Sequence, residues 1–543
     1  MKGIKGYLWP TLLALAVAIG VLIGGKLHFM DAPQKLFTTN SNKDKLNRLI
    51  DFIDHEYVDQ VNTDSIVDVT VNNILGKLDP HSVYIPKSEM EAVSENMKGD
   101  FAGIGVSFYR VGDTITVIRS IKNGPSQLQG IKAGDRILMA DLDTLYGKKL
   151  SNDAVVSTLK GKVGTKVRLQ VYRKTRDSIF EVTVRRDLIP IRSVEGYYML
   201  RGDMGYIKIN RFAESTFGEF KDALNKLKLR GAEKLVLDLR DNPGGYLGIA
   251  EKLADEFLGE DKLILFTKNK NGKIKKAYAT QKGDFENRPI YVLINERSAS
   301  ASEIIAGALQ DNDIGTIVGR RSFGKGLVQR EMGLGDGSAV RLTVSRYYTP
   351  TGRSIQRSYK EGNRDYYNRF LDRYSNGELS YADSLQVIDS LRFVTPKGKV
   401  VYGGGGIIPD VFVPIGSNEE EAIESMDGTF EFFNRFVFDH LERDRTRYEG
   451  YTQGEFLEGF QVDDILFDNF IQYVLDRKVR LDFYAQEEKI KAYIKANLAE
   501  QLYSPNLSAQ IKGRYDPMLE KVLELDSLAM EGARVGAVVR KGK

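Results

Sequence analysis

The sequence predicts a multidomain α/β protein, in which a β-rich module and a core of alternating strands and helices lie between an N-terminal helical unit and a C-terminal helical domain. Three observations support this fold class. The chain has 543 residues, enough for about three or four domains at roughly 150 residues each. Short β-type runs dominate residues 99–187. Strand-like and helix-like runs alternate over residues 204–350, which is typical of βα units around a partly parallel sheet.

The composition excludes several classes of protein. Lys and Arg number 78 against 74 Asp and Glu, a formal charge of +4, so no nucleic-acid arm or acidic tail is indicated and no nucleic-acid partner is expected. The absence of cysteine excludes disulfides, cysteine-based zinc sites, cysteine nucleophiles and a lipid-modified N-terminal cysteine. Few residues are available for histidine-dependent chemistry: His28, His55, His81 and His440.

Residues 1–30 are expected to form a membrane anchor or a signal segment. Lys2 and Lys5 precede an uncharged run over residues 7–25, about long enough to cross a bilayer core. Small residues at 14, 16 and 18 would suit a removable signal peptide, but the apolar run continues past them and favours an uncleaved anchor. The lysines place the N-terminus in the cytoplasm. We therefore expect a single-pass inner-membrane protein of the cell envelope, with the rest of the chain in the periplasm or otherwise outside the cytoplasm.

The next elements follow from periodicity. In the N-terminal helical region, residues 31–95, apolar residues recur at helical spacing over 46–57 and 66–75. The Asp-Pro dipeptide within residues 78–82 then predicts a turn. The β-rich module, residues 96–187, contains one expected helix at 152–159, and its expected strands are 105–108, 114–118, 136–139, 166–172 and 179–185.

The core is expected over residues 188–415 and the C-terminal helical domain over residues 416–543. Expected core strands lie at 205–209, 235–239, 289–294 and 315–318, with helices at 216–229, 248–257 and 301–310. The glycine-rich segment 403–406 marks the later boundary. Phenylalanines at 430–438 either form core or give a self-association face through which the chain would form a homo-oligomer.

Residues 298–303, Ser-Ala-Ser-Ala-Ser-Glu, lie between an expected strand and an expected helix. A strand-to-helix turn of small residues exposes a serine hydroxyl beside the free N–H groups of the helix N-terminus. The alternative is structural, because Ser300 and Glu303 also have the spacing of a capping box.

Lys325 lies in the segment Phe-Gly-Lys-Gly-Leu-Val-Gln. If residues 326–329 are extended, Lys325 and Gln329 share a face. Neighbouring apolar residues would lower the lysine pKa, so that a neutral amine acts as a base. A Ser–Lys pair needs no histidine, which suits this composition. The alternative is a solvated or phosphate-directed lysine, although the spacing of a phosphate-binding P-loop is absent.

Two glycine-containing segments are candidate binding elements. In residues 238–245 a strand runs into Gly244-Gly245, where the backbone can aim N–H groups at one point as an oxyanion hole requires. An ordinary strand–turn–helix junction is the alternative. Residues 101–106 offer N–H groups for a terminal carboxylate and a strand edge for an extended peptide, or else form a plain β-turn.

Taken together and in this order, these segments resemble the C-terminal processing (tail-specific) peptidases, serine peptidases with an inserted PDZ domain. The resemblance covers roughly residues 40–415. It rests on seven separate pieces: 78–82 (LDPHS), 103–105 (GIG), 130–135 (GIKAGD), 238–245 (DLRDNPGG), 298–303 (SASASE), 323–329 (FGKGLVQ) and 348–352 (YTPTG). An insertion at residues 361–398 and the helical tail from residue 416 have no counterpart in the minimal family pattern.

The resemblance implies a ClpP/crotonase-like peptidase core and a PDZ domain, and it assigns roles to residues. It makes Ser300 the nucleophile, Lys325 the general base and Gln329 the residue that positions the lysine. It implies that the oxyanion donors are the backbone N–H groups of Ala301 and of Gly244 or Gly245. It places the binding site for the substrate C-terminus at Gly103, Ile104, Gly105 and Val106.

The implied function is that of a membrane-anchored, extracytoplasmic serine endopeptidase, which uses a Ser–Lys dyad to cleave proteins recognised by their free C-terminal tails. We expect no metal or organic cofactor, because the sequence has no His, Cys or carboxylate cluster at ligand spacing. His81 is interpreted as a turn residue. Two other classes remain open: a catalytically silent PDZ adaptor that binds C-termini, and a crotonase-like acyl enzyme, which acyl-thioester turnover would reveal. Retention of Ser300, Lys325 and Gln329 argues against the adaptor.

Overall fold

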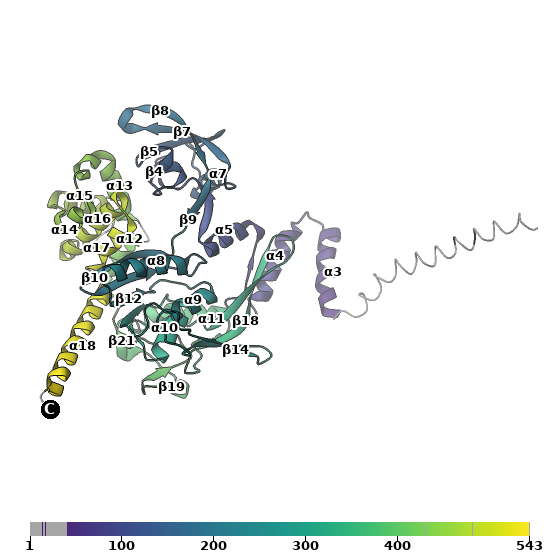
Figure 1. Ribbon diagram of the computed structural model, residues 1–543. Helices are drawn as coiled ribbons and strands as arrows, with labels where there is room; N and C mark the ends of the chain where they lie inside the picture. Colours follow the sequence, from purple (N-terminus) through teal and green to yellow (C-terminus); the bar gives the residue numbers. More distant parts are fainter. Residues whose placement is uncertain (1–13, 15–16, 18–40, 429–430, 480–481, 542–543) are drawn as a thin grey trace, which may run out of the picture. The chain divides into compact units, whose positions relative to one another are not determined.

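The structure is a computed structural model that describes residues 14, 17, 41–428, 431–479 and 482–541 (Figure 1). The membrane segment expected at residues 1–30 therefore lies outside the described residues, apart from Ala14 and Val17. None of the helices in the described ranges combines the length and the apolar character that a membrane crossing needs.

The chain up to Leu78 is a unit of its own. Its described part contains helices α3 (Ser41–Glu56) and α4 (Thr63–Leu75), at the positions where the hydrophobic spacing predicts them. Asn62 caps α4, because its side chain accepts a hydrogen bond from the Ser65 N–H at 3.0 Å.

A six-stranded sheet with the order β10-β11-β12-β15-β16-β21 forms the centre of the core. β10 is antiparallel to β11, and every other neighbouring pair is parallel. The central strands are buried on both faces, which explains their unbroken apolar sequences. The strands are β10 (Val194–Arg201), β11 (Met204–Ile209), β12 (Lys234–Asp238), β15 (Ile290–Ile294), β16 (Gly315–Gly319) and β21 (Val411–Phe412).

Helices cover both faces of this sheet, and each face has its own cluster of buried apolar residues. Residues of α8 (Thr216–Leu229), α9 (Leu247–Asp255) and α10 (Ala301–Asp311) belong to one cluster, with Ile207, Leu237 and Val292 of the sheet. Alternate residues of the same strands, such as Val236 and Leu293, pack with Met518 and Val522 of α18 (Pro517–Lys541) in the other. The last helix of the chain therefore packs against the central sheet.

A second, antiparallel sheet carries the segment that follows Lys325. Its long strand β18 pairs with β17 along one edge and with β1 and β13 along the other. The strands are β1 (Val83–Ile85), β13 (Leu263–Asn269), β14 (Ile274–Tyr278), β17 (Leu327–Gly333) and β18 (Ala339–Tyr348). Residues 361–398 contain α11 (Asn363–Leu371) and the start of a small hairpin, β19 (Arg392–Val394) and β20 (Val400–Tyr402).

The β-rich module has its own apolar core, which includes Val117, Ile137 and Val171. Its elements are β3 (Val106–Val111), β4 (Thr114–Ser120), α6 (Pro125–Leu128), β5 (Asp135–Ala140), β6 (Asp143–Thr144), α7 (Asn152–Leu159), β7 (Lys166–Arg173) and β8 (Ser178–Arg185). Helix α5 (Lys87–Lys98) precedes it. The entering strand β2 (Asp100–Gly103) pairs with the leaving strand β9 (Asp187–Pro190), so the module is an insertion with adjacent ends.

The described residues from 418 on are mostly helical, as predicted. Phe433, Phe436 and Phe438 are buried, and the first of these stacks on Phe470 with ring centroids 4.4 Å apart. Phe433 and Phe436 thus belong to the apolar core of this domain, while Phe438 packs on Tyr109 of the β-rich module, with ring centroids 5.6 Å apart. Their burial does not support self-association through them. The helices are α12 (Asn418–Gly428), α13 (Phe432–Asp444), α14 (Gln453–Gly459), α15 (Asp464–Leu475), α16 (Glu487–Leu502), α17 (Pro505–Gly513) and α18.

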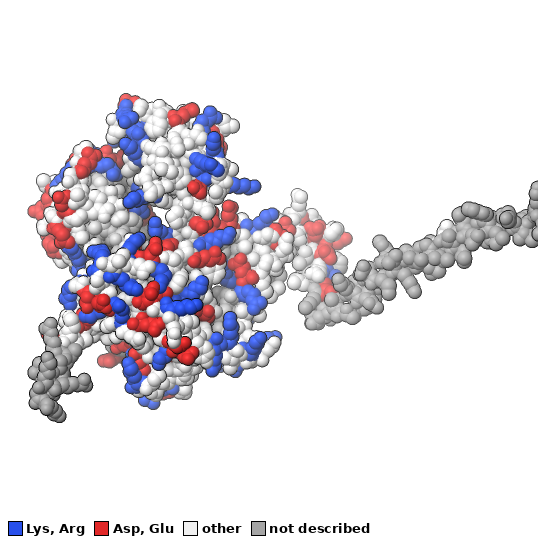
Figure 2. Space-filling model, viewed as in Figure 1, with Lys and Arg blue, Asp and Glu red and all other residues white. Residues whose placement is uncertain are grey.

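Charged side chains of both signs are interspersed over the face shown in Figure 2. This distribution matches the near balance of 78 basic and 74 acidic residues. Charge alone therefore does not mark a site on this face, and the chemistry of particular side chains has to do so.

Candidate active site and tail pocket

Ser300 lies at the junction between β15 and α10, where the sequence predicts it. Its backbone has φ 55° and ψ −111°, a sparsely populated conformation for a residue other than glycine. Strained backbone of this kind is typical of a nucleophile on a sharp strand-to-helix turn. The Ser300 N–H donates to Glu303 Oε2 at 2.8 Å, so the glutamate half of the expected capping box is present. The strain distinguishes Ser300 from an ordinary helix cap.

Lys325 lies in the loop between β16 and β17 and is largely buried. Burial lowers the pKa of its ammonium, and the nearby charge of Arg341 adds to the effect, while Glu303 and Asp79 oppose it. Lys325 Nζ donates to Gln329 Oε1 at 2.9 Å. The two side chains therefore share a face, as the extended spacing predicts. A lysine with a lowered pKa is suited to act as a base.

Gln329 is itself fixed by a second hydrogen bond. Its Nε2 donates to the backbone carbonyl of His81, which leaves the amide oxygen to face Lys325. His81 belongs to the turn predicted at residues 78–82, where the Asp79 carboxylate accepts from the N–H groups of His81 and Ser82 at 2.8 and 2.9 Å. The sequence did not predict a role for this turn in the site, because Gln329 lies 248 positions after His81.

The His81 side chain takes no part in the Ser300–Lys325 arrangement. Its Nε2 lies 3.0 Å from the Tyr366 hydroxyl. Burial lowers the pKa of His81 to about 3, and the charge of Lys325 adds to the effect. His81 is therefore neutral near pH 7, and with so low a pKa it is a weak base.

Glu303 joins the two loops that carry the candidate dyad. Besides the Ser300 N–H, its carboxylate accepts from Ser322 Oγ and the Gly324 N–H, both at 2.6 Å, and from the Lys325 N–H at 2.9 Å. Burial raises the pKa of Glu303, and these hydrogen bonds oppose the shift. The sequence predicts only the local capping role of Glu303. Helical spacing gives no information about its contacts with residues 322–325, which are distant in sequence.

Candidate oxyanion donors lie beside Ser300. A side chain on Gly244 would place Cβ 2.7 Å from Ser300 Cβ and 3.0 Å from the Ala301 nitrogen, so the loop approaches as closely as only glycine allows. The Gly244 N–H is already engaged, since it donates to Asn242 Oδ1 at 2.9 Å. The N–H groups of Gly245 and Ala301 have no acceptor among the described residues. Of the two predicted glycines, Gly245 therefore has the free donor.

The glycine loop is tied to the nucleophile loop through Asn242. Its backbone carbonyl accepts from the Ala299 N–H and from Ser302 Oγ, both at 3.0 Å. Its side-chain Nδ2 donates to the Ile209 carbonyl at 2.8 Å. The donors and the candidate nucleophile consequently belong to one hydrogen-bonded assembly.

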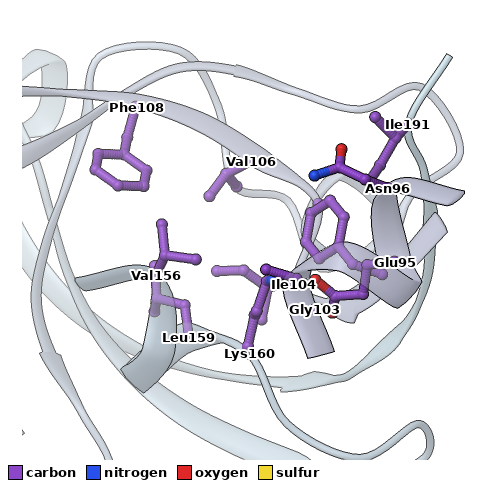
Figure 3. A pocket seen from close by; sticks show the side chains of 13 residues that line it. Glu95, Asn96, Gly103, Ile104, Val106, Phe108, Val156, Leu159, Lys160 and Ile191 are labelled. Atoms are coloured by element: carbon purple, nitrogen blue, oxygen red, sulfur yellow. Dashed lines mark hydrogen bonds and ion pairs between the residues drawn. The ribbon is translucent and has the colours of Figure 1, made fainter. Parts of the chain in front are cut away.

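The β-rich module contains an apolar pocket of about 320 Å³ between β3 and α7 (Figure 3). All four residues predicted to bind a C-terminus line it: Gly103, Ile104, Gly105 and Val106. Phe108, Val156 and Leu159 add apolar walls. The N–H groups of Ile104 and Gly105 have no acceptor in the described part of the chain. The pocket therefore combines apolar walls with backbone donors at its end.

Helix α5 closes one side of this pocket with charged and polar residues that the sequence did not single out. Glu95 and Asn96 line the pocket together with Lys160, which directly follows α7 (Figure 3). Lys160 Nζ lies 2.5 Å from Glu95 Oε2, and it lies 5.0 Å from the centroid of the Phe101 ring. A cation is thus held at the pocket by a carboxylate from a neighbouring element.

Models of three known families match parts of the chain. The model of peptidase family S41 matches residues 203–362, that of a PDZ domain matches residues 102–184, and that of a family of unknown function, DUF8443, matches residues 430–504. The chain is 35% identical over 348 residues to the carboxy-terminal-processing protease of Bartonella bacilliformis, covering 62% of this chain and 78% of the relative.

Two further similarities are weaker. The chain is 35% identical over 322 residues to a probable CtpA-like serine protease of Staphylococcus aureus, covering 59% of this chain and 63% of that protein. A solved photosystem II D1 C-terminal processing protease is 27% identical, with a TM-score of 0.34, over 57% of this chain and 83% of that chain. The similarity to the Bartonella relative and the match to the family model show that the chain belongs to the carboxy-terminal-processing serine proteases of peptidase family S41.

Proposed function

We propose that this protease cleaves proteins selected by their free C-terminal tails, with Ser300 and Lys325 as its catalytic dyad. The observation that supports the dyad most directly is the Glu303 carboxylate, which holds the backbone of the strained Ser300 and of the desolvated Lys325 at once. A nucleophile and a base fixed by one buried group are preorganised for attack.

The chemistry follows from these positions. Neutral Lys325 Nζ takes the proton of the Ser300 hydroxyl as Oγ bonds to the carbonyl carbon of the scissile peptide. The N–H groups of Gly245 and Ala301 stabilise the oxyanion of the tetrahedral intermediate. The C–N bond then breaks, and the lysine ammonium gives its proton to the leaving amine. Lys325 then takes a proton from water as the water oxygen bonds to the acyl carbon, and it returns this proton to Ser300 Oγ as the ester bond breaks.

The dyad has to close for this reaction. Within the described residues Lys325 Nζ donates to Gln329, and no hydrogen bond joins it to Ser300 Oγ. Catalytic hydrogen bonds often tighten only in the complex with substrate. The proposal therefore requires Lys325 Nζ to approach Ser300 Oγ when a peptide binds.

The pocket of the PDZ domain supports tail selection. Its apolar walls suit an apolar terminal side chain, and the free N–H groups of Ile104 and Gly105 suit a carboxylate. An extended peptide would add along β3. Selection and cleavage would then involve separate sites of one chain.

The test uses the full chain in detergent and an unstructured protein that ends in an apolar residue with a free carboxylate, beside the same protein with an amidated end. We expect cleavage of the free-ended substrate only, abolished in Ser300→Ala and Lys325→Ala and retained in the control Lys268→Ala, whose side chain is exposed. A wild type that binds the free-ended protein without cleaving it would instead support the silent-adaptor alternative.

We also propose that residues 1–30 anchor the protease in the inner membrane, with the catalytic part outside the cytoplasm. The uncharged run over residues 7–25 and the lysines before it support this orientation. Membrane fractionation of cells and protease accessibility in spheroplasts test it. Extraction of the full chain by carbonate, or protection of the catalytic part in intact spheroplasts, would contradict the proposal.

A further inference from the structure

We propose that Asp516, in the C-terminal helical domain, is a positioning residue for the oxyanion loop, residues 239–245. The inference rests on the proposed role of Gly245 as an oxyanion donor. It gives the C-terminal helical domain a function in catalysis, since this domain would fix the position of the oxyanion loop.

The contact is a two-point ion pair between the helical domain and the oxyanion loop. Arg240 Nη1 donates to Asp516 Oδ1 at 3.0 Å, and Nη2 donates to Oδ2 at 2.5 Å. Both side chains are largely buried, with 18% of each exposed. Two parallel hydrogen bonds between a planar guanidinium and a carboxylate fix orientation as well as distance.

Asp516 is held in place by the helix that it begins. Its Oδ1 accepts from the N–H of Met518 at 2.9 Å and from that of Leu519 at 3.3 Å, so it caps α18. Met518 and Leu519 are buried against the central sheet. The carboxylate that Arg240 meets is therefore a fixed point on the core.

Arg240 is also bound on the core side. Asp238, fully buried at the end of β12, accepts from the Arg240 backbone N–H at 2.9 Å and from Nε at 3.0 Å. The Tyr206 hydroxyl donates to the same carboxylate at 2.7 Å. The guanidinium thus lies between a carboxylate of the sheet and one of the helical domain.

Arg240 and the proposed donor, the Gly245 N–H, belong to the same short loop, so a shift of Arg240 would also move the donor. The next residue, Asp241, donates its N–H to Asn295 Oδ1 at 3.0 Å, and Asn242 accepts the Gly244 N–H. Gly245 lies only five positions after Arg240 along the chain. Because a misplaced group at an active site costs far more in rate than in binding, small shifts of this loop should reduce turnover.

α18 offers a matched control at the other end of the same strand. Lys234, the first residue of β12, donates from Nζ to Asp526 Oδ2 at 2.9 Å, and these side chains are 13% and 9% exposed. This pair attaches α18 to the sheet but lies at the end of β12 that is remote from the oxyanion loop. Asp526→Asn therefore weakens docking of the helix without altering the Arg240 contact.

The experiment compares Asp516→Asn with Asp526→Asn in the full chain. Asparagine caps helices as well as aspartate does, so Asp516→Asn keeps the cap of α18 and removes the charge that holds Arg240. We expect kcat to fall by about tenfold or more, with KM nearly unchanged, because the lost interaction acts on the transition state. A peptide aldehyde, whose tetrahedral adduct places an oxygen between the donors, should bind more weakly by a similar factor. Asp516→Glu, which retains the charge, should recover part of the rate.

Asp526→Asn should lower the thermal midpoint to a similar extent as Asp516→Asn and leave kcat within about twofold of wild type. Hydrogen exchange of residues 239–246 should rise in Asp516→Asn and not in Asp526→Asn. Equal kcat values in the two variants, or unchanged exchange in Asp516→Asn, would overturn the inference. A wild type without peptidase activity would contradict the proposed function instead, and the exchange measurement would still decide whether Asp516 positions the loop.

Discussion

At the scale of single residues, the lysine of the candidate dyad depends on an amide that is oriented from outside the catalytic loop. Gln329 presents its oxygen to Lys325 because its nitrogen is bound to the His81 carbonyl. An amide oxygen accepts a hydrogen bond without adding a full charge, so it orients the amine while burial still lowers the lysine pKa. A carboxylate at this position would orient the lysine equally well and would stabilise its protonated form.

Gln329→Glu should therefore move the pH dependence of catalysis. In wild type, kcat/KM should rise with pH through the lowered pKa of Lys325 and then level off, since only the neutral amine acts as base. The new carboxylate raises this pKa, so the rising limb should shift to higher pH. The measurement is the pH profile of kcat/KM between about pH 5 and 10.

Gln129→Glu, at an exposed position, adds the same charge and should leave the profile unchanged. The rising limb should not reflect His81, because burial keeps this side chain neutral at any pH well above about 3. A limb that stays in place in Gln329→Glu would show that Lys325 is not the group that titrates.

The ion pair at the tail pocket predicts a second single-residue effect. Glu95→Gln releases the ammonium of Lys160 from its carboxylate partner, so a free C-terminus should bind about threefold more tightly, in line with the modest energies of partly exposed ion pairs. Lys160→Met should weaken binding of the free-ended peptide and leave an amidated peptide unaffected. Fluorescence anisotropy with the two peptides measures both effects.

Lys166→Met provides the control, because Lys166 is exposed in the same domain and does not line the pocket. If Lys160→Met affected the free-ended and amidated peptides equally, Lys160 would contribute apolar contact and not recognise the carboxylate.

At the scale of elements, the oxyanion loop depends on the close approach of two backbones. Phe212 donates its N–H to the Gly244 carbonyl, and its own carbonyl accepts from the Tyr246 N–H, both at 2.9 Å. A Cβ on Gly245 would lie 2.2 Å from the Phe212 oxygen, which no rearrangement of a side chain can relieve. Residue 245 must therefore be glycine if this bridge is to form.

Gly245→Ala should accordingly separate the loop from Phe212 and displace its donor. We expect kcat to fall by about a hundredfold or more, the range found when an oxyanion donor is removed. Gly248→Ala is the matched control, since this position lies in α9 with open space around it and alanine favours a helix. Activity and the thermal midpoint of both variants check the prediction. Full activity in Gly245→Ala would contradict the assignment of this donor.

The elements also show which features of the fold and the site can be predicted from local sequence. Hydrophobic spacing is enough to predict β12, β15 and α10, and the two-residue period is enough to place Lys325 and Gln329 on one face, because these patterns are local. The role of Glu303 could not be predicted in this way. Its partners in residues 322–325 come together only when the loop after β16 packs on the start of α10.

The same limit applies to the contacts of the oxyanion loop. The family resemblance implies a donor from Gly244 or Gly245, but only the structure shows that Asn242 engages the first of them. The ion pair of Arg240 with Asp516 joins residues 276 positions apart, in a domain without a counterpart in the minimal family pattern. Such pairs leave no periodic signal in one sequence.

At the scale of the whole molecule, the apolar residues divide into separate cores. The PDZ domain has its own cluster, and the helical domain has another, while the central sheet carries one on each face. The PDZ cluster includes no residue of the core sheet, and a two-stranded ribbon, β2 with β9, joins the domain to the core. With the helical domain it shares an ion pair, in which Arg136 Nη2 lies 3.2 Å from Glu442 Oε2, and a ring contact, of Tyr109 with Phe438. Large multidomain chains of this kind do not unfold as a single two-state unit.

The PDZ domain should therefore unfold in its own calorimetric transition. Ile137→Ala, at a fully buried position of its core, should lower that transition alone, since such truncations cost about 2–5 kcal/mol of local stability. Ile207→Ala, equally buried in the core sheet, should lower the other transition instead. A free-ended tail peptide at a hundred times its Kd should stabilise the PDZ transition by about 2.7 kcal/mol. An amidated peptide should leave it unchanged. If Ile137→Ala and the peptide moved every transition together, the tail site and the catalytic core would form one cooperative unit, and tail binding would stabilise the active site directly.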